Sequence, residues 1–118
     1  MENQIIVNNL LLSYEVFGNV NNSSTSLIFL HGWRSSGQVW NNIANQLISN
    51  SVNQPAVAYA LDLPGFGKSQ MPAHSMTVGD YAQIVSEFIK KLELKNVIIV
   101  GHSFGGRIGI KLAVMNPS

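Results

Sequence analysis

Short apolar runs alternate with segments of helical spacing along most of this chain. Uninterrupted apolar runs, the pattern typical of buried strands, occupy Leu27–Leu30, Ala56–Leu61 and Val97–Val100. Apolar residues that recur every three or four positions, as in helices that bury one face, occupy residues 39–48, 77–92 and 104–115. This alternation predicts an α/β protein whose parallel strands are joined by right-handed helical crossovers.

The N-terminal part of the chain predicts a different kind of strand pairing. Ile5–Val7 and Leu10–Val16 are apolar or half-alternating, and Asn8–Asn9 between them favours a tight turn. We therefore expect an antiparallel hairpin at one edge of the sheet, followed by an exposed polar loop over residues 18–26. The predicted fold is a three-layer αβα sandwich with a mostly parallel sheet and an N-terminal antiparallel hairpin.

Composition and charge narrow the class of protein. The chain has 118 residues, of which 46% are hydrophobic and 11% charged, and we expect no more than one domain. A formal net charge of +1 without long runs of like charge predicts neither a nucleic-acid nor a membrane partner. No apolar run approaches the roughly 18 residues that span a bilayer, and the polar start lacks the features of a signal peptide, which favours a cytoplasmic protein.

Cysteine and histidine usage bears on metals and cofactors. The absence of cysteine excludes disulfides and thiolate zinc sites within the chain. His31, His74 and His102 do not form a ligand pair at helical spacing. We therefore predict no metal and no cofactor.

Ser103 stands between a predicted strand and a predicted helix, in Gly101-His102-Ser103-Phe104-Gly105-Gly106. In such a tight, strained turn, the hydroxyl of a serine stands clear above the sheet. Gly101 and Gly105 occupy positions where a Cβ would collide, and we expect Gly106 to let the helix approach its strand. The pattern alone is weak and also fits an incidental serine in a glycine-rich turn, but the strand and helix around it favour a nucleophile.

His31-Gly32-Trp33 lies at the carboxyl end of another predicted strand, where open α/β sheets bind ligands. Gly32 permits a turn in which the N–H of Trp33 points inward as a hydrogen-bond donor. His31 precedes the turn, and we prefer a role as a hydrogen-bonded brace of this loop to one as a proton shuttle.

Asp62 opens a turn, Asp62-Leu63-Pro64-Gly65, in which its side chain is expected to accept backbone N–H groups. The alternative role, the acid of a catalytic triad, is disfavoured because Asp62 precedes Ser103 in the chain. A phosphate-binding loop ending in Gly67-Lys68-Ser69 is also disfavoured, since Asp62 stands where that motif requires glycine.

Taken in order, these three motifs resemble those of the α/β-hydrolase superfamily, and the resemblance extends from Ile5 to Pro117. It implies that Ser103 is the nucleophile and that the N–H groups of Trp33 and Phe104 form the oxyanion hole. It also implies that the parent enzyme hydrolyses a small acyl substrate at an ester, thioester or amide bond. The serine argues against the epoxide-hydrolase and haloalkane-dehalogenase branches, which have aspartate at this position.

The chain departs from that family after Ser103. The family order is nucleophile, acid, histidine, and the residues from Phe104 to Ser118 include neither an acidic residue nor a histidine. We therefore expect residues 1–118 to be the N-terminal part of a single α/β-hydrolase domain, with the 97–100 strand at an exposed edge. Because His102 should point away from Ser103, we expect this chain alone to be inactive.

Other functions remain open on the same scaffold. A lyase, a cofactor-free haloperoxidase-like enzyme and a non-catalytic binding protein all fit the three motifs. The sequence does not separate these possibilities, and it predicts no particular oligomeric state.

Overall fold

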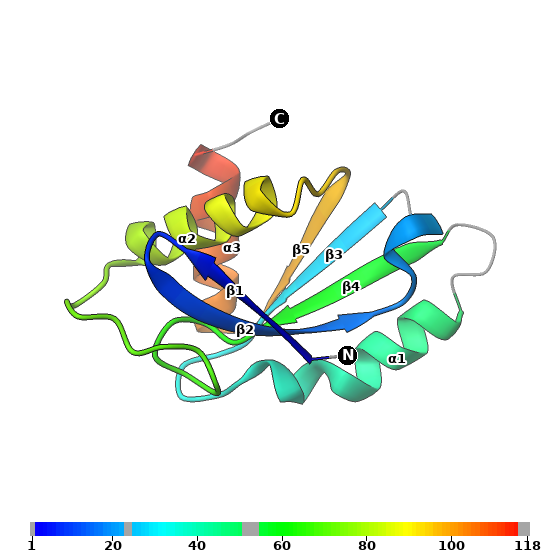
Figure 1. The fold of residues 1–118 in the computed structure, drawn as a ribbon, viewed down its shortest axis with the longest axis horizontal. Coiled ribbons are helices and arrows are strands. Elements are labelled where there is room, and N and C mark those ends of the chain that lie inside the picture. Colours follow the sequence, from blue (N-terminus) through cyan, green and yellow to red (C-terminus); the bar gives the residue numbers. More distant parts are fainter. Residues whose placement is uncertain (1, 23–24, 51–54, 116–118) are drawn as a thin grey trace.

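A five-stranded mixed sheet lies at the centre of the structure, a computed structural model that describes residues 2–22, 25–50 and 55–115. Its strand order is β1-β2-β4-β3-β5. The strands are β1 (Glu2–Val7), β2 (Leu10–Phe17), β3 (Thr25–Leu30), β4 (Ala56–Leu61) and β5 (Val97–Gly101). β3, β4 and β5 run parallel, whereas β1 and β2 form an antiparallel hairpin that joins the sheet through β4 (Figure 1). The predicted sheet, with its N-terminal hairpin, is confirmed.

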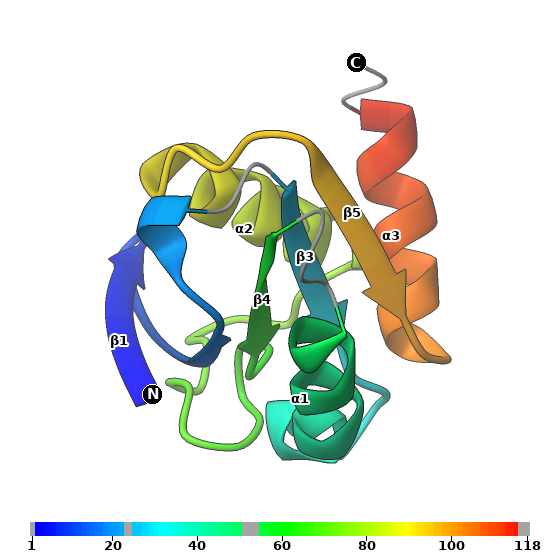
Figure 2. The same ribbon diagram turned by 90° about the vertical axis from the view of Figure 1, so that its right-hand side faces the viewer.

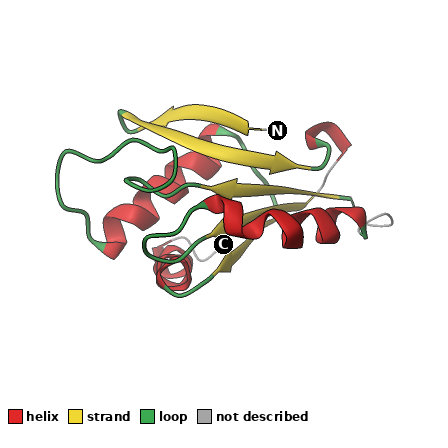
Figure 3. Ribbon diagram, turned by 90° about the horizontal axis from the view of Figure 1, so that it is seen from below, coloured by secondary structure: helices red, strands yellow, loops and turns green. Residues whose placement is uncertain are grey.

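Helices cover both faces of this sheet, as Figure 2 shows. On one face, α1 (Asn41–Ser49) packs with the short 3-10 helix η2 (Gly37–Trp40) over a small cluster of Phe29, Trp40, Ala44, Ala58 and Ala60. On the other face, α2 (Val78–Lys91) and α3 (Phe104–Met115) enclose the larger part of the core, which includes the buried side chains of Leu12, Ile28, Tyr81, Phe88 and Ile108. The predicted three layers are therefore present, and Figure 3 shows them from below.

Several element boundaries differ from those expected. Both hairpin strands are longer than predicted: the pairing of β1 with β2 begins at Glu2 opposite Glu15, and β2 extends to Phe17, which pairs with Ala58 of β4. The expected polar loop over residues 18–26 contains a 3-10 helix, η1 (Val20–Asn22), and β3 already begins at Thr25. Residues 23 and 24 of that loop lie outside the described residues.

The interpretation of residues 97–100 as a strand buried on both faces is wrong. β5 pairs with β3 and is the last strand in the order, so one of its edges has no neighbouring strand among the described residues. Ile98 is 51% exposed as a result. The expected position at an edge of the sheet is correct, and it explains why the burial expectation failed.

The start of α2 shows how the sequence determines a helix boundary. The Oγ1 of Thr77 accepts a hydrogen bond from the N–H of Asp80 at 3.1 Å, and the Asp80 carboxylate accepts one from the N–H of Thr77 at 2.9 Å. This reciprocal capping box, expected from the spacing of the two residues, satisfies backbone donors that the helix itself leaves unpaired. None of the helices in the described ranges combines the length and the apolar character required to cross a membrane.

Candidate active site

Ser103 occupies the turn between β5 and α3 with a φ of +55°, a left-handed conformation that is unusual for a residue with a side chain. Its side chain is exposed. A Cβ on Gly101 would lie 2.5 Å from the carbonyl oxygen of Gly105. A Cβ on Gly105 would lie 2.7 Å from the carbonyl oxygen of His31 and closer still to that of Leu30. Glycine is thus required at both positions flanking Ser103.

The expectation for Gly106 is wrong. A Cβ on Gly106 would lie 3.7 Å from the carbonyl oxygen of Gly101, which is an ordinary contact. The close approach of helix to strand lies instead at Gly109, where a Cβ would come within 3.1 Å of the Cγ2 of Ile99. Sequence reasoning missed Gly109, although a glycine inside a helical pattern is itself a signal of close packing.

The loop after β3 lies directly against this turn. A Cβ on Gly32 would lie 3.6 Å from the Cβ of Ser103 and 3.3 Å from the Nδ1 of His102. His102 is exposed beside Gly32, and no hydrogen bond joins it to Ser103 in the described part of the chain. The structure therefore brings Gly32 and Ser103 together at the carboxyl ends of β3 and β5.

Trp33 and Phe104 have backbone N–H groups that are available to a ligand. The N–H of Ser35 donates to the carbonyl oxygen of Gly32 at 3.1 Å, which closes a turn around Trp33 and Arg34. Arg34 has a φ of +65°, the feature that a type II turn requires at this position. Phe104 is the first residue of α3, where helical N–H groups have no partner in their own helix. Within residues 2–22, 25–50 and 55–115, neither amide has a hydrogen-bond partner.

His31 is fully buried, and both of its ring nitrogens are occupied. Its Nδ1 lies 2.7 Å from the carbonyl oxygen of Gly32, and the N–H of Leu63 donates to its Nε2 at 3.0 Å. Because Nε2 accepts a hydrogen bond, the ring is neutral and carries its proton on Nδ1. Burial lowers the pKa of His31, opposed in part by the hydrogen bond to Gly32 and the charge of Asp62. This geometry suits a loop brace and leaves no nitrogen to take a proton from Ser103.

The lowered pKa of His31 predicts a stability that depends on pH. The unfolded chain binds a proton at this histidine more readily than the folded chain does. The free energy of unfolding should therefore rise with pH between the lowered pKa of the folded chain and the ordinary pKa of histidine. The contribution of neutral His31 is complete above the ordinary pKa of 6.5 and is lost as pH falls through the lower folded value. We expect thermal melts between pH 7 and pH 4 to show this loss, and a His31→Gln variant, less stable throughout, to lack that component. An unchanged pH profile in His31→Gln would contradict the assignment.

Asp62 holds together the turn after β4. Its Oδ1 accepts from the N–H of Gly37 at 2.7 Å, and its Oδ2 accepts from the N–H of Lys68 at 3.0 Å. Its backbone oxygen also accepts from the hydroxyl of Ser69 at 2.5 Å. Asp62 thus accepts backbone N–H groups, as its position in the sequence suggested, and these bonds link the loops after β3 and β4.

We expect Asp62→Ala to lower the free energy of unfolding by about 2–3 kcal/mol, because it leaves two N–H groups without their charged acceptor. Asp62→Asn keeps one acceptor oxygen and should lose about half as much. Urea denaturation of both variants measures the difference. Equal stability of Asp62→Ala and the parent protein would show that solvent replaces both bonds without cost.

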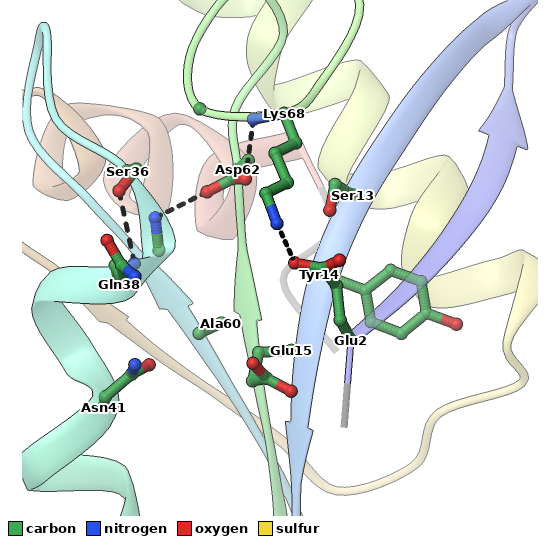
Figure 4. A pocket seen from close by; sticks show the side chains of 12 residues that line it. Glu2, Ser13, Tyr14, Glu15, Ser36, Gln38, Asn41, Ala60, Asp62 and Lys68 are labelled. Carbon is green, nitrogen blue, oxygen red and sulfur yellow. Dashed lines mark hydrogen bonds and ion pairs between the residues drawn. The ribbon is translucent and has the colours of Figure 1, made fainter.

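The cavity beside Asp62 does not include Ser103. It has a volume of about 160 Å³ and is lined mostly by polar and charged residues from β1, β2, the turn after β4 and the segment 36–41 that leads into α1, among them Glu2, Glu15, Asn41 and Lys68 (Figure 4). Lys68 crosses this cavity to form an ion pair with Glu2 at 2.5 Å. Nowhere in the described residues do three or more histidines and carboxylates form a group able to hold a metal ion. No residue of the turn at Ser103 lines this cavity, so the candidate site rests on that turn and not on the cavity.

In sequence and in fold, the chain is similar to known hydrolases. Over 95 residues the chain is 35% identical to a pimeloyl-[acyl-carrier protein] methyl ester esterase of Proteus mirabilis, covering 80% of this chain and 33% of that protein. A membrane phospholipase A described as a bacterial virulence factor superposes with a TM-score of 0.87 at 30% identity, over 99% of this chain and 36% of the other. An esterase from Exiguobacterium antarcticum superposes with a TM-score of 0.84 at 26% identity, over 98% of this chain and 41% of the other.

The chain spans between about a fifth and a third of the length of the curated relatives it matches. A sequence model described as the alpha/beta hydrolase fold matches residues 25–118, a range that contains all three motifs and every strand of the parallel part of the sheet. This chain belongs to the alpha/beta hydrolase fold family.

Proposed function

We propose that the full-length protein containing this chain is a serine hydrolase that cleaves carboxylic esters, with thioesters and amides as chemically related substrates. The observation that supports this most directly is the turn at Ser103. An exposed hydroxyl is held there in a left-handed backbone conformation, beside two N–H groups without a partner in the described residues. Backbone strain of this kind is characteristic of functional sites.

In the proposed reaction, the Oγ of Ser103 attacks the carbonyl carbon of the ester. The carbonyl oxygen becomes an oxyanion, which the N–H groups of Trp33 and Phe104 stabilise, and the alcohol then leaves with a proton. Water releases the acid from the acyl-enzyme in a second step. Each oxyanion donor of this kind contributes about 3–4 kcal/mol to the stabilisation of the transition state.

The proton of Ser103 needs a base, and none of the described histidines, His74 included, is hydrogen-bonded to the Ser103 hydroxyl. Both ring nitrogens of His31 are hydrogen-bonded, and His102 makes no hydrogen bond to Ser103 in the part of the chain that the structure describes. Neither a histidine nor an acidic residue comes after Ser103 within these 118 residues. The proposal therefore places the base and its acid in other parts of the full-length protein.

A fluorophosphonate probe tests the proposal, because it labels only a serine that is activated as a nucleophile. We expect stoichiometric labelling of the full-length protein at Ser103 and none in Ser103→Ala. Ser49→Ala, which removes an exposed hydroxyl at the end of α1, is the matched control and should label normally. Labelling that persists in Ser103→Ala would assign the nucleophile to another residue. A folded protein that takes up no label would point to a lyase or a binding protein on this scaffold.

A further inference from the structure

Four aromatic rings from four different segments stand in a row beside Ser103. The ring of Phe66, from the turn after β4, lies 4.8 Å from that of Trp33, at an interplanar angle of 70°. The Trp33 ring lies 5.1 Å from that of Phe104, at 81°, and the Phe104 ring lies 5.1 Å from that of Tyr81, at 87°. All three contacts are edge-to-face, the arrangement that aromatic pairs prefer.

Buried residues anchor this row at both ends. Tyr81, on α2, is 5% exposed. At the other end, the ring of Phe66 also contacts His31 edge-to-face at 5.8 Å, and His31 is held by its two hydrogen bonds. The backbone of Phe66 is itself fixed, since its N–H donates to the carbonyl oxygen of Leu63 at 2.9 Å and its own carbonyl oxygen accepts from Ser69 at 3.1 Å.

The two residues in the middle of the row are those that carry the available N–H groups. Trp33 is 57% exposed, so burial in the core does not fix its position. It lies in a turn whose next residue, Arg34, has a positive φ, and a side chain disfavours that conformation. The contacts of the Trp33 ring with Phe66 and Phe104 therefore oppose a displacement of Trp33, which would carry its N–H with it.

We propose that Phe66 is a positioning residue, which acts through the ring of Trp33 to hold the Trp33 N–H where it stabilises the oxyanion. This inference rests on the proposed hydrolysis at Ser103, although the contact between the two rings does not. Oxyanion donors contribute to the rate only when their position is fixed before the charge develops. Loss of the Phe66 ring should therefore lower kcat and leave KM largely unchanged, because the substrate binds before the charge forms.

The test compares Phe66→Leu, which removes the ring, with Phe66→Tyr, which keeps it, in the full-length protein. We expect kcat for a soluble ester to fall about three- to tenfold in Phe66→Leu, the effect that corresponds to the loss of one such ring pair. Phe66→Tyr should retain the parent kcat. Phe17→Leu makes the same substitution at a half-buried position that packs on the opposite face of the sheet, and it should leave kcat unchanged.

Hydrogen exchange followed by mass spectrometry provides a readout that does not depend on catalysis. We expect faster exchange over residues 32–35 in Phe66→Leu than in Phe66→Tyr or Phe17→Leu, because the turn around Trp33 loses its support. If Phe66→Leu does not fold, Phe66→Met replaces it in both measurements.

An unchanged kcat in folded Phe66→Leu overturns the inference. A rise in KM with no change in kcat also overturns it, because it would place Phe66 in contact with the substrate. An equal fall in the kcat of Phe66→Tyr also overturns the inference. Failure of the proposed function looks different: either the parent protein would not turn over the ester or Ser103→Ala would turn it over normally, while hydrogen exchange would still report whether Phe66 supports the turn.

Discussion

Ser103→Ala is expected to lower the kcat of the full-length protein for ester hydrolysis by about 10⁴–10⁶-fold, the loss expected on removal of a serine nucleophile. The fold should remain intact, because the Ser103 side chain is exposed and its removal opens no cavity. Turnover is measured with a soluble ester, and far-UV circular dichroism checks the fold. Activity within tenfold of the parent protein would remove Ser103 from the mechanism.

Ser103→Gly separates the strain at this residue from its chemistry. With a φ of +55°, Ser103 is in a conformation that costs a residue with a side chain about 1–2 kcal/mol and costs glycine almost nothing. The greater freedom of glycine in the unfolded chain offsets about half of this gain. We expect Ser103→Gly to be as inactive as Ser103→Ala and more stable than it by up to about 1 kcal/mol. Lower stability of the glycine variant would show that the turn is not strained.

The order of the elements was predictable because each depends on a local pattern. Apolar runs such as Leu27–Leu30 and Ala56–Leu61 identify strands, and the three-residue spacing of Thr77 and Asp80 identifies the start of α2. The turn at Ser103 could be predicted equally well, because glycines stand in the sequence at the two positions where a side chain would clash. These features need no knowledge of distant parts of the chain.

Burial and tertiary contacts were harder to predict from the sequence. The apolar run of β5 matches that of a central strand, yet Ile98 is half exposed because exposure depends on what lies beside the strand. The contacts of Phe66 with Trp33, and of Phe104 with Tyr81, join residues that are far apart in sequence and in different elements. No periodicity connects such residues, so the row of rings could only be found in the structure.

The type of the turn at Arg34 is a third feature that the sequence did not predict. The Arg34 φ of +65° gives the turn closed between Gly32 and Ser35 the geometry of a type II turn. A type II turn favours glycine or asparagine at this position, and arginine gives no such signal. The sequence therefore indicated a turn after His31-Gly32 but not its type.

Gly105 and Gly106 provide the sharpest test of the packing around Ser103. Substitution of these adjacent glycines by alanine is expected to change the free energy of unfolding in opposite directions. A Cβ on Gly105 would lie 2.7 Å from the carbonyl oxygen of His31 and closer to that of Leu30, and both atoms belong to the backbone at the end of β3. Neither can move without displacing the loop that carries Trp33. We expect Gly105→Ala to lower the free energy of unfolding of the full-length protein by about 3 kcal/mol or more.

Gly106→Ala is the matched control. Its Cβ would meet its nearest neighbour, the carbonyl oxygen of Gly101, at 3.7 Å, so the substitution creates no clash. Alanine is favoured over glycine inside a helix by about 1 kcal/mol, and the variant should be stabilised by up to that amount. Urea denaturation of the two variants measures both effects on one scale. Similar stabilities would mean that α3 can shift away from β3, and the close packing that holds Ser103 beside the loop after β3 would then not be a fixed feature of the fold.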